Sequence, residues 1–576
     1  MDNIYNSVSA GPFIFNDHFL PIAGLITFLK STNFNRKTGD GMGSGKYKHG
    51  SLAGLLFLAA ILFAEGCSPA SKSSNQQQKS SQRPNIIVMY SDDHTAQAIG
   101  AYRNALRYGL ELDHTPTPNI DRLADGGMRF DNAFVSNSIC KPSRAVFLSG
   151  MHSHKNGVLT NSDSISVNLE TFPIMLREAG YQTAMIGKWH LVTKPQGFDY
   201  YEVLYGQGPY YNPTLKTPEG DKQYEGHTSE IITNSTLSWL KQGRDRDKPF
   251  MLIYNHKAPH RNWLPGPNHL YDYKNRDLAE PPSLFYDYSG LTKAAKEQDM
   301  EIGSTLTWGW DLKFQNHPIT GEPLRGWEQV ISRNKLTEKQ RKIIEEAYAE
   351  ENRELVQKIG GMSEKELLRW KYQRYIKDYL RVIRGLDDGV GRLMAYLERE
   401  KLLENTVVIY AGDQGFFLGE NGWFDKRWIY EESMRMPLIA HWPEGIKPES
   451  VNEYLVQNLD LAPTILELAE AEVPKRIQGR SLLSLFKGEK PPEWREGLYY
   501  HYYEGPPKVH KVAKHYGLRT DRYTLAHFYE NEDWELFDLK EDPEQLQSVY
   551  DDPEYAEIQA RLKQQLSDLR SKYGVE

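Results

Sequence analysis

Two pairs of oxygen-bearing side chains each follow a short apolar run of this sequence. The pairs are Asp92-Asp93 and Asp413-Gln414. One such pair is weak evidence for a site, because acidic residues commonly occupy turns. Two pairs together offer three carboxylates and one amide oxygen, a set of donors that suits Ca²⁺ or Mg²⁺ better than Zn²⁺. The sequence therefore predicts that these four residues bind one divalent cation.

The apolar runs before these pairs have the pattern of buried β-strands. Continuous apolar segments are typical of strands that are covered on both faces. The predicted strands are 85–90, 183–186, 250–254 and 406–410, and the predicted helices are 119–125 and an amphipathic helix over 376–397. Strands that alternate with helices favour an α/β fold with a mostly parallel sheet. Such sheets place their active sites at the carboxyl ends of the strands, where both acidic pairs lie.

The chain after residue 487 has a different pattern. Aromatic-rich segments at 498–503, 516–528 and 534–539 predict antiparallel strands, and a helix is expected to close the chain. We therefore expect a small C-terminal antiparallel α+β domain after a junction rich in Pro, Gly and Lys. Its aromatic side chains are expected to form a core rather than a sugar-binding surface. The predicted domains are 84–486 and 487–576.

The composition excludes several classes of protein. The 576-residue chain has a net charge of −8, 39% hydrophobic residues and two cysteines. The hydrophobic content excludes a disordered chain and allows a large core. The acidic balance argues against a nucleic-acid partner, which would require a basic face. Two cysteines exclude a disulfide scaffold and a cysteine-rich zinc site.

The first cysteine, Cys67, lies in a segment with the features of an export signal. A basic flank at 46–49 precedes an apolar run at 52–64, which is too short to span a bilayer. The segment resembles a bacterial lipoprotein signal with Cys67 as the lipidated new N-terminus, although the triplet 64–66 departs from the usual pattern. An ordinary cleaved signal is the alternative. Both predict an exported protein, in the periplasm or attached to the cell envelope only through a lipid anchor.

Two further predictions concern the segments around this signal. Residues 1–67 comprise the signal and an extension before Met42, which stands where a start codon would be expected. Residues 68–83, rich in Ser and Gln, are predicted to form a flexible tether. Cys140 then remains as the one cysteine that export does not explain.

The segment around Cys140 resembles the signature of a known enzyme family. Residues 140–150 read CKPSRAVFLSG, which is similar to the signature of the sulfatases, the formylglycine-dependent branch of the alkaline phosphatase superfamily. Without this resemblance, a lone cysteine would more simply be a buried small side chain. Met151 departs from the family's pattern, in which an arginine is usual. The resemblance implies a large alkaline-phosphatase-like, mostly parallel sheet between helices.

Further motifs of the same family follow in the same order along the chain. They are SDD at 91–93, GKWH at 187–190, APH at 258–260, DQG at 413–415 and Lys426. The first and fourth motifs contain the two acidic pairs and correspond to the family's metal motifs. Gln414 stands where an asparagine is more frequent, and its amide oxygen can serve as the same kind of ligand. The resemblance extends from Pro84 to the end of the chain.

The resemblance implies how the site would cleave a sulfate ester. Cys140 would be oxidised to formylglycine by a partner, either a formylglycine-generating enzyme or an anaerobic sulfatase-maturating enzyme. The modified Cys140 would be the nucleophile and an additional ligand of one divalent cation, Ca²⁺ with Mg²⁺ as the alternative. Arg144 would anchor the nucleophile, and Lys188 and Lys426 would bind sulfate oxygens. Catalysis would consist mostly of positioning and electrostatic stabilisation.

The resemblance also assigns roles to two histidines. His260 would be the acid that protonates the leaving sugar oxygen, and His190 the base that releases sulfate from residue 140 and regenerates the aldehyde. Three neighbours of His260 have two possible interpretations. His256, Lys257 and Arg261 are either cations that bind substrate or parts of a solvated loop.

The substrate is expected to be a sulfated carbohydrate. An exported, aromatic-rich sulfatase resembles enzymes that act on polysaccharides, and we expect algal oligosaccharides such as those of ulvan. The alternatives are a glycosaminoglycan or mucin sugar, or a formylglycine-dependent phosphonate or phosphodiester hydrolase. A protein with unmodified Cys140 would be a carbohydrate-binding lipoprotein. Trp189 and Trp263 either stack on a sugar ring or pack in the core.

Overall fold

The computed structural model describes residues 83–106, 116–507 and 509–575 of the chain. The predicted signal, Met42, Cys67 and the tether up to residue 82 lie outside the described residues. Export and the lipid anchor therefore stay predictions. No helix among the described residues is long and apolar enough to cross a membrane.

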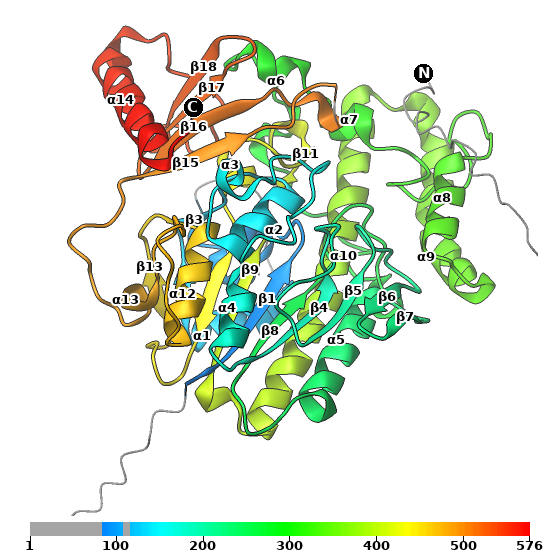
Figure 1. Cartoon of the computed structure of the whole chain (residues 1–576). Helices are drawn as coiled ribbons and strands as arrows, with labels where there is room; N and C mark the ends of the chain where they lie inside the picture. Colours follow the sequence, from blue (N-terminus) through cyan, green and yellow to red (C-terminus); the bar gives the residue numbers. More distant parts are fainter. Residues whose placement is uncertain (1–82, 107–115, 508, 576) are drawn as a thin grey trace, which may run out of the picture. The chain divides into compact units, whose positions relative to one another are not determined.

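Among the described residues, one large sheet contains ten strands in the order β13-β2-β12-β9-β1-β8-β4-β5-β6-β7 (Figure 1). Its central strands run parallel and are β9 (Thr406–Gly412), β1 (Asn85–Ser91), β8 (Phe250–Asn255), β4 (Gln182–Lys188) and β5 (Tyr200–Leu204). The outer strands are β13 (Ser450–Asn452), β2 (Met128–Phe130), β12 (Leu438–His441), β6 (Thr214–Thr217) and β7 (Gly220–Gln223). The predicted mostly parallel α/β sheet is confirmed, and each predicted central strand extends slightly further than expected.

Both faces of this sheet are covered, as the continuous apolar strands require. On β1, Ile87 and Met89 belong to one core cluster, whereas Ile86 and Val88 belong to another, because successive side chains of a strand point to opposite faces. The first face is covered by α1 (Pro118–Asp125), α5 (Thr228–Ser238) and α10 (Glu364–Arg399). The second face is covered by α2 (Cys140–Ser149), α4 (Phe172–Glu178) and α12 (Leu461–Leu468) (Figure 1).

The long helix α10 begins at Glu364, earlier than the predicted start at residue 376. Its first turn is stabilised by a capping box, in which the Glu366 amide donates to Ser363 Oγ and the Ser363 amide donates to the Glu366 carboxylate. The early turns of α10 are rich in exposed charged residues, but Leu367, Leu368 and Trp370 already pack against the core, so the apolar face begins before residue 376.

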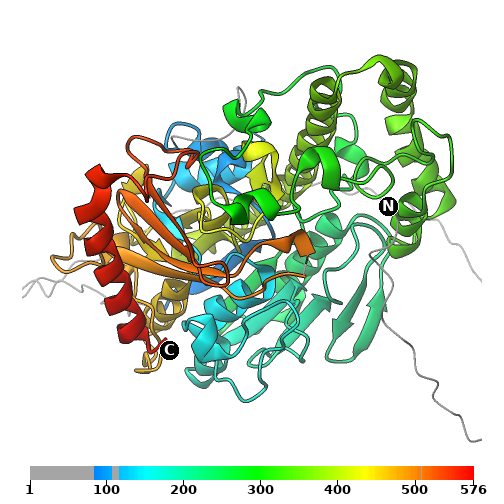
Figure 2. The same cartoon turned by 90° about the horizontal axis from the view of Figure 1, so that it is seen from above.

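The predicted C-terminal antiparallel sheet is confirmed. It consists of β15 (Gly497–Tyr502), β16 (His515–Thr520), β17 (Tyr523–Phe528) and β18 (Asp533–Asp538). One face packs on α14 (Ala556–Tyr573), as Figure 2 shows with the strands in orange and α14 in red. The other face contributes Tyr500 and Phe528 to a core with Trp428 and Tyr430. The described residues form one compact unit, and the boundary at residue 487 stays a prediction.

Shorter elements complete the described structure. The remaining helices are α3 (Ser153–Asn156), α6 (Lys293–Glu297), α7 (Ile302–Thr305), α8 (Arg325–Arg333), α9 (Glu338–Lys358), α11 (Glu431–Met434) and α13 (Leu483–Phe486). The remaining strands are β3 (Ala133–Phe134), β10 (Phe417–Leu418), β11 (Phe424–Asp425) and β14 (Val456–Gln457).

Candidate active site

The structure brings the two acidic pairs together at one edge of the large sheet. Strands β1 and β9 are parallel neighbours, and their last residues, Ser91 and Gly412, lie opposite each other. Adjacent side chains of an extended strand would diverge, but Asp93 adopts a φ of 65° that turns the chain. As a result, one carboxylate oxygen from each of Asp92, Asp93 and Asp413 lies within 4.8 Å of the others.

This acidic cluster fits a divalent cation. Asp92 Oδ1, Asp93 Oδ2 and Gln414 Oε1 are buried and accept no hydrogen bond from the described residues, and buried polar atoms are costly when unpaired. Burial and the charge of Asp92 raise the pKa of Asp413 well above its ordinary value, because neighbouring like charges oppose ionisation. A bound Ca²⁺ or Mg²⁺ would bind these oxygens and favour ionisation of all three carboxylates.

Cys140 is the first residue of α2 and lies beside this cluster. Its side chain is buried, its Sγ lies 3.8 Å from Gln414 Nε2, and atoms of Asp92 and His260 lie within 4.8 Å. Burial and the charge of Asp92 raise the pKa of the Cys140 thiol to about 12. Because the thiolate is the nucleophilic form of cysteine, the unmodified side chain is a poor nucleophile here.

Helix α2 also places Arg144 in the site. Residues four apart share one face of a helix, so Cys140 and Arg144 point to the same side. Arg144 donates from Nε and Nη2 to Asp413 Oδ2 at 3.0 and 2.9 Å, and from Nη1 to the Lys188 carbonyl oxygen at 3.1 Å. These bonds fix the guanidinium group beside the cluster.

Two lysines approach the cluster from other elements. Lys188 ends β4, and its Nζ forms an ion pair with Asp92 and a hydrogen bond with Gln207. Lys426 follows β11, and its Nζ forms an ion pair with Asp93. Both lysines are buried, so these charges interact more strongly than they would in water.

The two histidines lie at the same edge of the sheet. His260 donates from Nδ1 to the Arg261 carbonyl oxygen at 2.6 Å, and its Nε2 lies 3.9 Å from Asp93 Oδ2. His190 follows Lys188 by two residues, adopts a φ of 59°, and has no hydrogen-bond partner for Nδ1 among the described residues. Burial lowers the pKa of both histidines well below the ordinary value, so both are neutral in the free protein at neutral pH.

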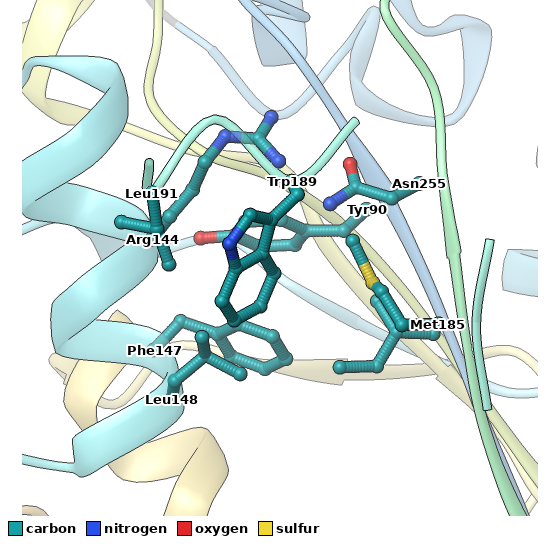
Figure 3. A pocket seen from close by; sticks show the side chains of 9 residues that line it. Tyr90, Arg144, Phe147, Leu148, Met185, Trp189, Leu191 and Asn255 are labelled. Carbon is teal, nitrogen blue, oxygen red and sulfur yellow. The ribbon is translucent and has the colours of Figure 1, made fainter. Parts of the chain in front are cut away.

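The two tryptophans pack in the core. Trp263 is fully buried, with its ring centroid 4.8 Å from that of Tyr375. Trp189 lies among Tyr90, Phe147 and other lining residues of a small cavity beside Arg144 (Figure 3). That cavity measures about 10 Å³, which is room for one water molecule. Neither ring offers an open stacking surface for a sugar.

The residues next to His260 are not a solvated loop. His256 and Lys257 are buried, and Arg261 donates to both carboxylate oxygens of Asp311 at 2.7 Å. Asn255 was not predicted as a site residue, and its Nδ2 donates to the Lys188 carbonyl oxygen at 2.6 Å. Asn255 ends β8, so the signal that identified the acidic pairs, a polar residue at a strand end, would have identified it too.

Comparison with protein families agrees with this geometry. Residues 78–471 match the sulfatase family model, and residues 419–572 match the model of the C-terminal region of N-sulphoglucosamine sulphohydrolase. The chain belongs to the sulfatase family and is a sulfuric ester hydrolase. Members of this family use a formylglycine and a divalent cation.

Individual relatives indicate which sulfatases are most similar. The N-acetylglucosamine-6-O-sulfatase of Bacteroides thetaiotaomicron is 43% identical over 525 residues, which cover 90% of each chain. A solved structure with a TM-score of 0.80 and 43% identity covers 86% of this chain and 98% of its own; that enzyme is bound to its substrate, D-glucosamine-2-N,6-O-disulfate. The ulvan-active sulfatase of Formosa agariphila is 24% identical over 528 residues, covering 86% of this chain and 84% of that protein.

Proposed function

We propose that this protein hydrolyses a 6-O-sulfate ester on a glucosamine unit of a glycosaminoglycan or mucin-type glycan. The observation that supports this best is the 43% identity to an N-acetylglucosamine-6-O-sulfatase over 525 residues. The expected preference for ulvan is not supported, because the similarity to the ulvan-active sulfatase is much lower, at 24%. The glycosaminoglycan alternative therefore replaces the algal one.

The cation site is assigned to the four oxygen-bearing residues and modified Cys140. Asp92, Asp93, Asp413 and Gln414 would hold the cation, for which we propose Ca²⁺, with Mg²⁺ as the alternative. When bound, the cation supplies positive charge that stabilises negative charge on a sulfate oxygen. Asp92, Asp93 and Gln414 each have a buried oxygen that accepts no hydrogen bond from the described residues, which supports this assignment.

The cationic side chains position the sulfate ester. Lys188 and Lys426 bring ammonium groups to the acidic cluster, each paired with a different aspartate of it. Arg144 is held by Asp413 and presents its guanidinium beside residue 140. Because these groups are buried and already oriented, little reorganisation is needed as charge develops in the transition state.

The two histidines move protons. The bond from Nδ1 of His260 to the Arg261 carbonyl oxygen leaves Nε2 as the atom that would deliver a proton to the leaving sugar oxygen. A sulfate ester beside His260 would oppose the effect of burial on its pKa, because an anion favours the imidazolium. His190 would act as the base that releases sulfate from residue 140.

Maturation of Cys140 by a formylglycine-forming enzyme would have to precede folding. The side chain of Cys140 is 1% exposed in the folded chain, so a modifying enzyme cannot reach it there. Export through the signal around Cys67 is also proposed, and mass spectrometry of the mature N-terminus distinguishes a lipidated Cys67 from a plain cleaved end.

A substrate panel tests the proposed function. Protein with Cys140 converted to formylglycine, checked by mass spectrometry of the peptide that contains it, is incubated with N-acetylglucosamine 6-sulfate, glucosamine-2-N,6-O-disulfate, galactose 6-sulfate and ulvan oligosaccharides. Released sulfate is measured, and Cys140→Ala is the inactive control. We expect both 6-sulfated glucosamines to be cleaved fastest. Faster release from galactose 6-sulfate or ulvan oligosaccharides would contradict the proposal.

A further inference from the structure

Lys257 is a buried cation of the active site that has no anionic partner. It is 4% exposed, and among the described residues its Nζ forms no ion pair and donates no hydrogen bond. Its Nζ lies over the face of the Tyr210 ring, 4.7 Å from the ring centroid. Lys188 and Lys426, by contrast, each pair with an aspartate. Burying an unpaired ammonium group is costly.

The backbone holds Lys257 beside the reacting groups. Lys257 follows β8 by two residues and begins the turn that carries His260, whose amide donates to the Lys257 carbonyl oxygen at 3.0 Å. The Tyr210 hydroxyl donates to the His260 carbonyl oxygen at 2.6 Å. Tyr210 therefore supports both residues, with its ring against the ammonium group and its hydroxyl on the turn.

The charges around Lys257 favour an anion at this point. Its pKa is lowered to about 7 by burial and by the charge of Lys188, an effect that Asp92 and Asp93 only partly oppose. When Lys257 is charged, the three carboxylates of the cluster are outnumbered by four cationic side chains, which are Arg144, Lys188, Lys257 and Lys426. A divalent cation in the cluster adds to this excess of positive charge. An anion in contact with Lys257 would restore its charge and offset the excess.

We propose that Lys257 is a third ammonium group of the sulfate-binding site and contacts an oxygen of the ester's sulfate group and of the free sulfate product. This inference rests on one part of the proposed function, the binding of a sulfate ester. It does not depend on which sugar carries that ester. Lys188 and Lys426 form ion pairs with the proposed metal ligands Asp92 and Asp93, whereas Lys257 pairs with none of the proposed ligands. The contact does not depend on the alcohol to which the sulfate is attached.

The test compares variants of the mature enzyme with inorganic sulfate as the probe. We expect Lys257→Met to raise the inhibition constant of inorganic sulfate, measured with an aryl sulfate substrate, by about 10–100-fold, the loss typical of a hydrogen bond to a charged group. The value of kcat/KM should fall by a similar factor for the aryl sulfate and for a 6-sulfated sugar. Lys257→Arg, which keeps the charge, should retain most of the sulfate affinity.

Lys371→Met is the matched control, because Lys371 is also a buried lysine but donates to the Gly303 carbonyl oxygen outside the site. It should leave the inhibition constant unchanged. If Lys257→Met does not fold, Lys257→Gln takes its place, since it keeps a polar side chain. An unchanged inhibition constant in folded Lys257→Met or Lys257→Gln protein overturns the proposal, and so does a loss confined to the sugar substrate. Failure to cleave glucosamine 6-sulfates would overturn only the sugar assignment, because the aryl sulfate and inorganic sulfate measurements remain.

Discussion

At the scale of single residues, the charged side chains of the site hold one another in place. Asp92 pairs with Lys188, Asp93 with Lys426, and Asp413 with Arg144. All of these groups are buried, so removal of one partner leaves an uncompensated charge in a medium of low dielectric constant. Substitutions here are expected to change both the position and the protonation of the remaining groups.

The first prediction concerns the cation. Asp92→Asn and Asp413→Asn should lose metal and activity together, because each removes one of three carboxylate charges from the site. Metal analysis of the unaltered protein should find about one Ca²⁺ or Mg²⁺ per chain. Asp387→Asn is the control, since Asp387 is buried but accepts from Asn119 and Ile120 instead. Stoichiometric zinc without an alkaline-earth ion would show that the cation is misassigned.

The second prediction separates the two histidines. His260→Ala should slow cleavage of sugar sulfates roughly 10²–10⁴-fold, the loss typical of a missing general acid. Activated aryl sulfates should be affected much less, because their leaving groups need no proton. His190→Ala should instead trap sulfate on residue 140, which mass spectrometry after a single turnover would detect as a heavier peptide. If sulfate is trapped on residue 140 in His260→Ala instead, and that variant loses the same factor in rate on sugar and aryl sulfates, the roles of the two histidines are exchanged.

At the scale of elements, the site depends on how closely strands β4 and β8 approach each other. Gly187 lies one residue before Lys188 and has a φ of 112°. A Cβ atom at Gly187 would lie 1.8 Å from the Asn255 carbonyl oxygen. The strands therefore require glycine at this position, and any separation would displace Lys188 and Asn255 together.

The third prediction tests this contact. Gly187→Ala should lower the free energy of unfolding by more than the 1–2 kcal/mol or so that a left-handed backbone alone costs, because the strands must also separate. It should reduce activity as Lys188 moves. Gly157→Ala is the matched control, since Gly157 also has a positive φ, of 81°, but nothing lies within 4 Å of its Cβ position. Equal unfolding free energies for the two variants in urea would contradict the prediction.

At the scale of the whole molecule, a buried ion-pair network joins the C-terminal sheet to the part of the chain that contains the ten-stranded sheet. Glu431 of α11 accepts from Arg435 Nε at 3.0 Å and from Arg519 Nε of β16 at 2.6 Å. Burial alone would raise the pKa of Glu431, but the two arginines outweigh it and lower the pKa to about 2. The small sheet is thereby tied to the segment that follows Lys426.

The fourth prediction concerns this network. Arg519→Met should lower the free energy of unfolding by about 3–5 kcal/mol, because it leaves buried Glu431 with one partner fewer. Lys514→Met, which removes an exposed pair with Glu530 on the same sheet, should cost about 1 kcal/mol or less. Thermal and urea unfolding measure both effects. An Arg519→Met variant as stable as Lys514→Met would show that the network contributes little.

The pKa of Glu431 also predicts how this contribution depends on pH. Because the folded-state pKa lies below the unfolded value of 4.5, the unfolded chain binds a proton first as the pH falls. The stabilisation by Glu431 is therefore complete above about pH 4.5 and is lost towards pH 2. Glu431→Gln should lose less stability across this window than the unaltered protein, as measured by urea unfolding at each pH.

Much of the fold and part of the site could be predicted from local sequence patterns. The apolar runs predict the central strands because burial on both faces requires apolar side chains at every position. The carboxyl ends of parallel strands share one edge of the sheet, so the sequence predicts that Asp92 and Asp413 lie close together. The spacing of Cys140 and Arg144 is that of one helix face. The predicted start of α10 was too late, because the charged residues of its first turns obscure an apolar pattern that Leu367, Leu368 and Trp370 already carry.

Only the tertiary structure decided which of the polar and aromatic residues near the site face it and which pair or pack elsewhere. Lys257 and Arg261 are neighbours of similar charge, but Arg261 pairs with Asp311, whereas Lys257 lies unpaired against Tyr210. Trp263 is a core residue because Tyr375, from a distant helix, packs against it. Local patterns report propensity and burial, whereas the partner of a side chain depends on which remote segment covers it, and that is determined when the whole chain folds.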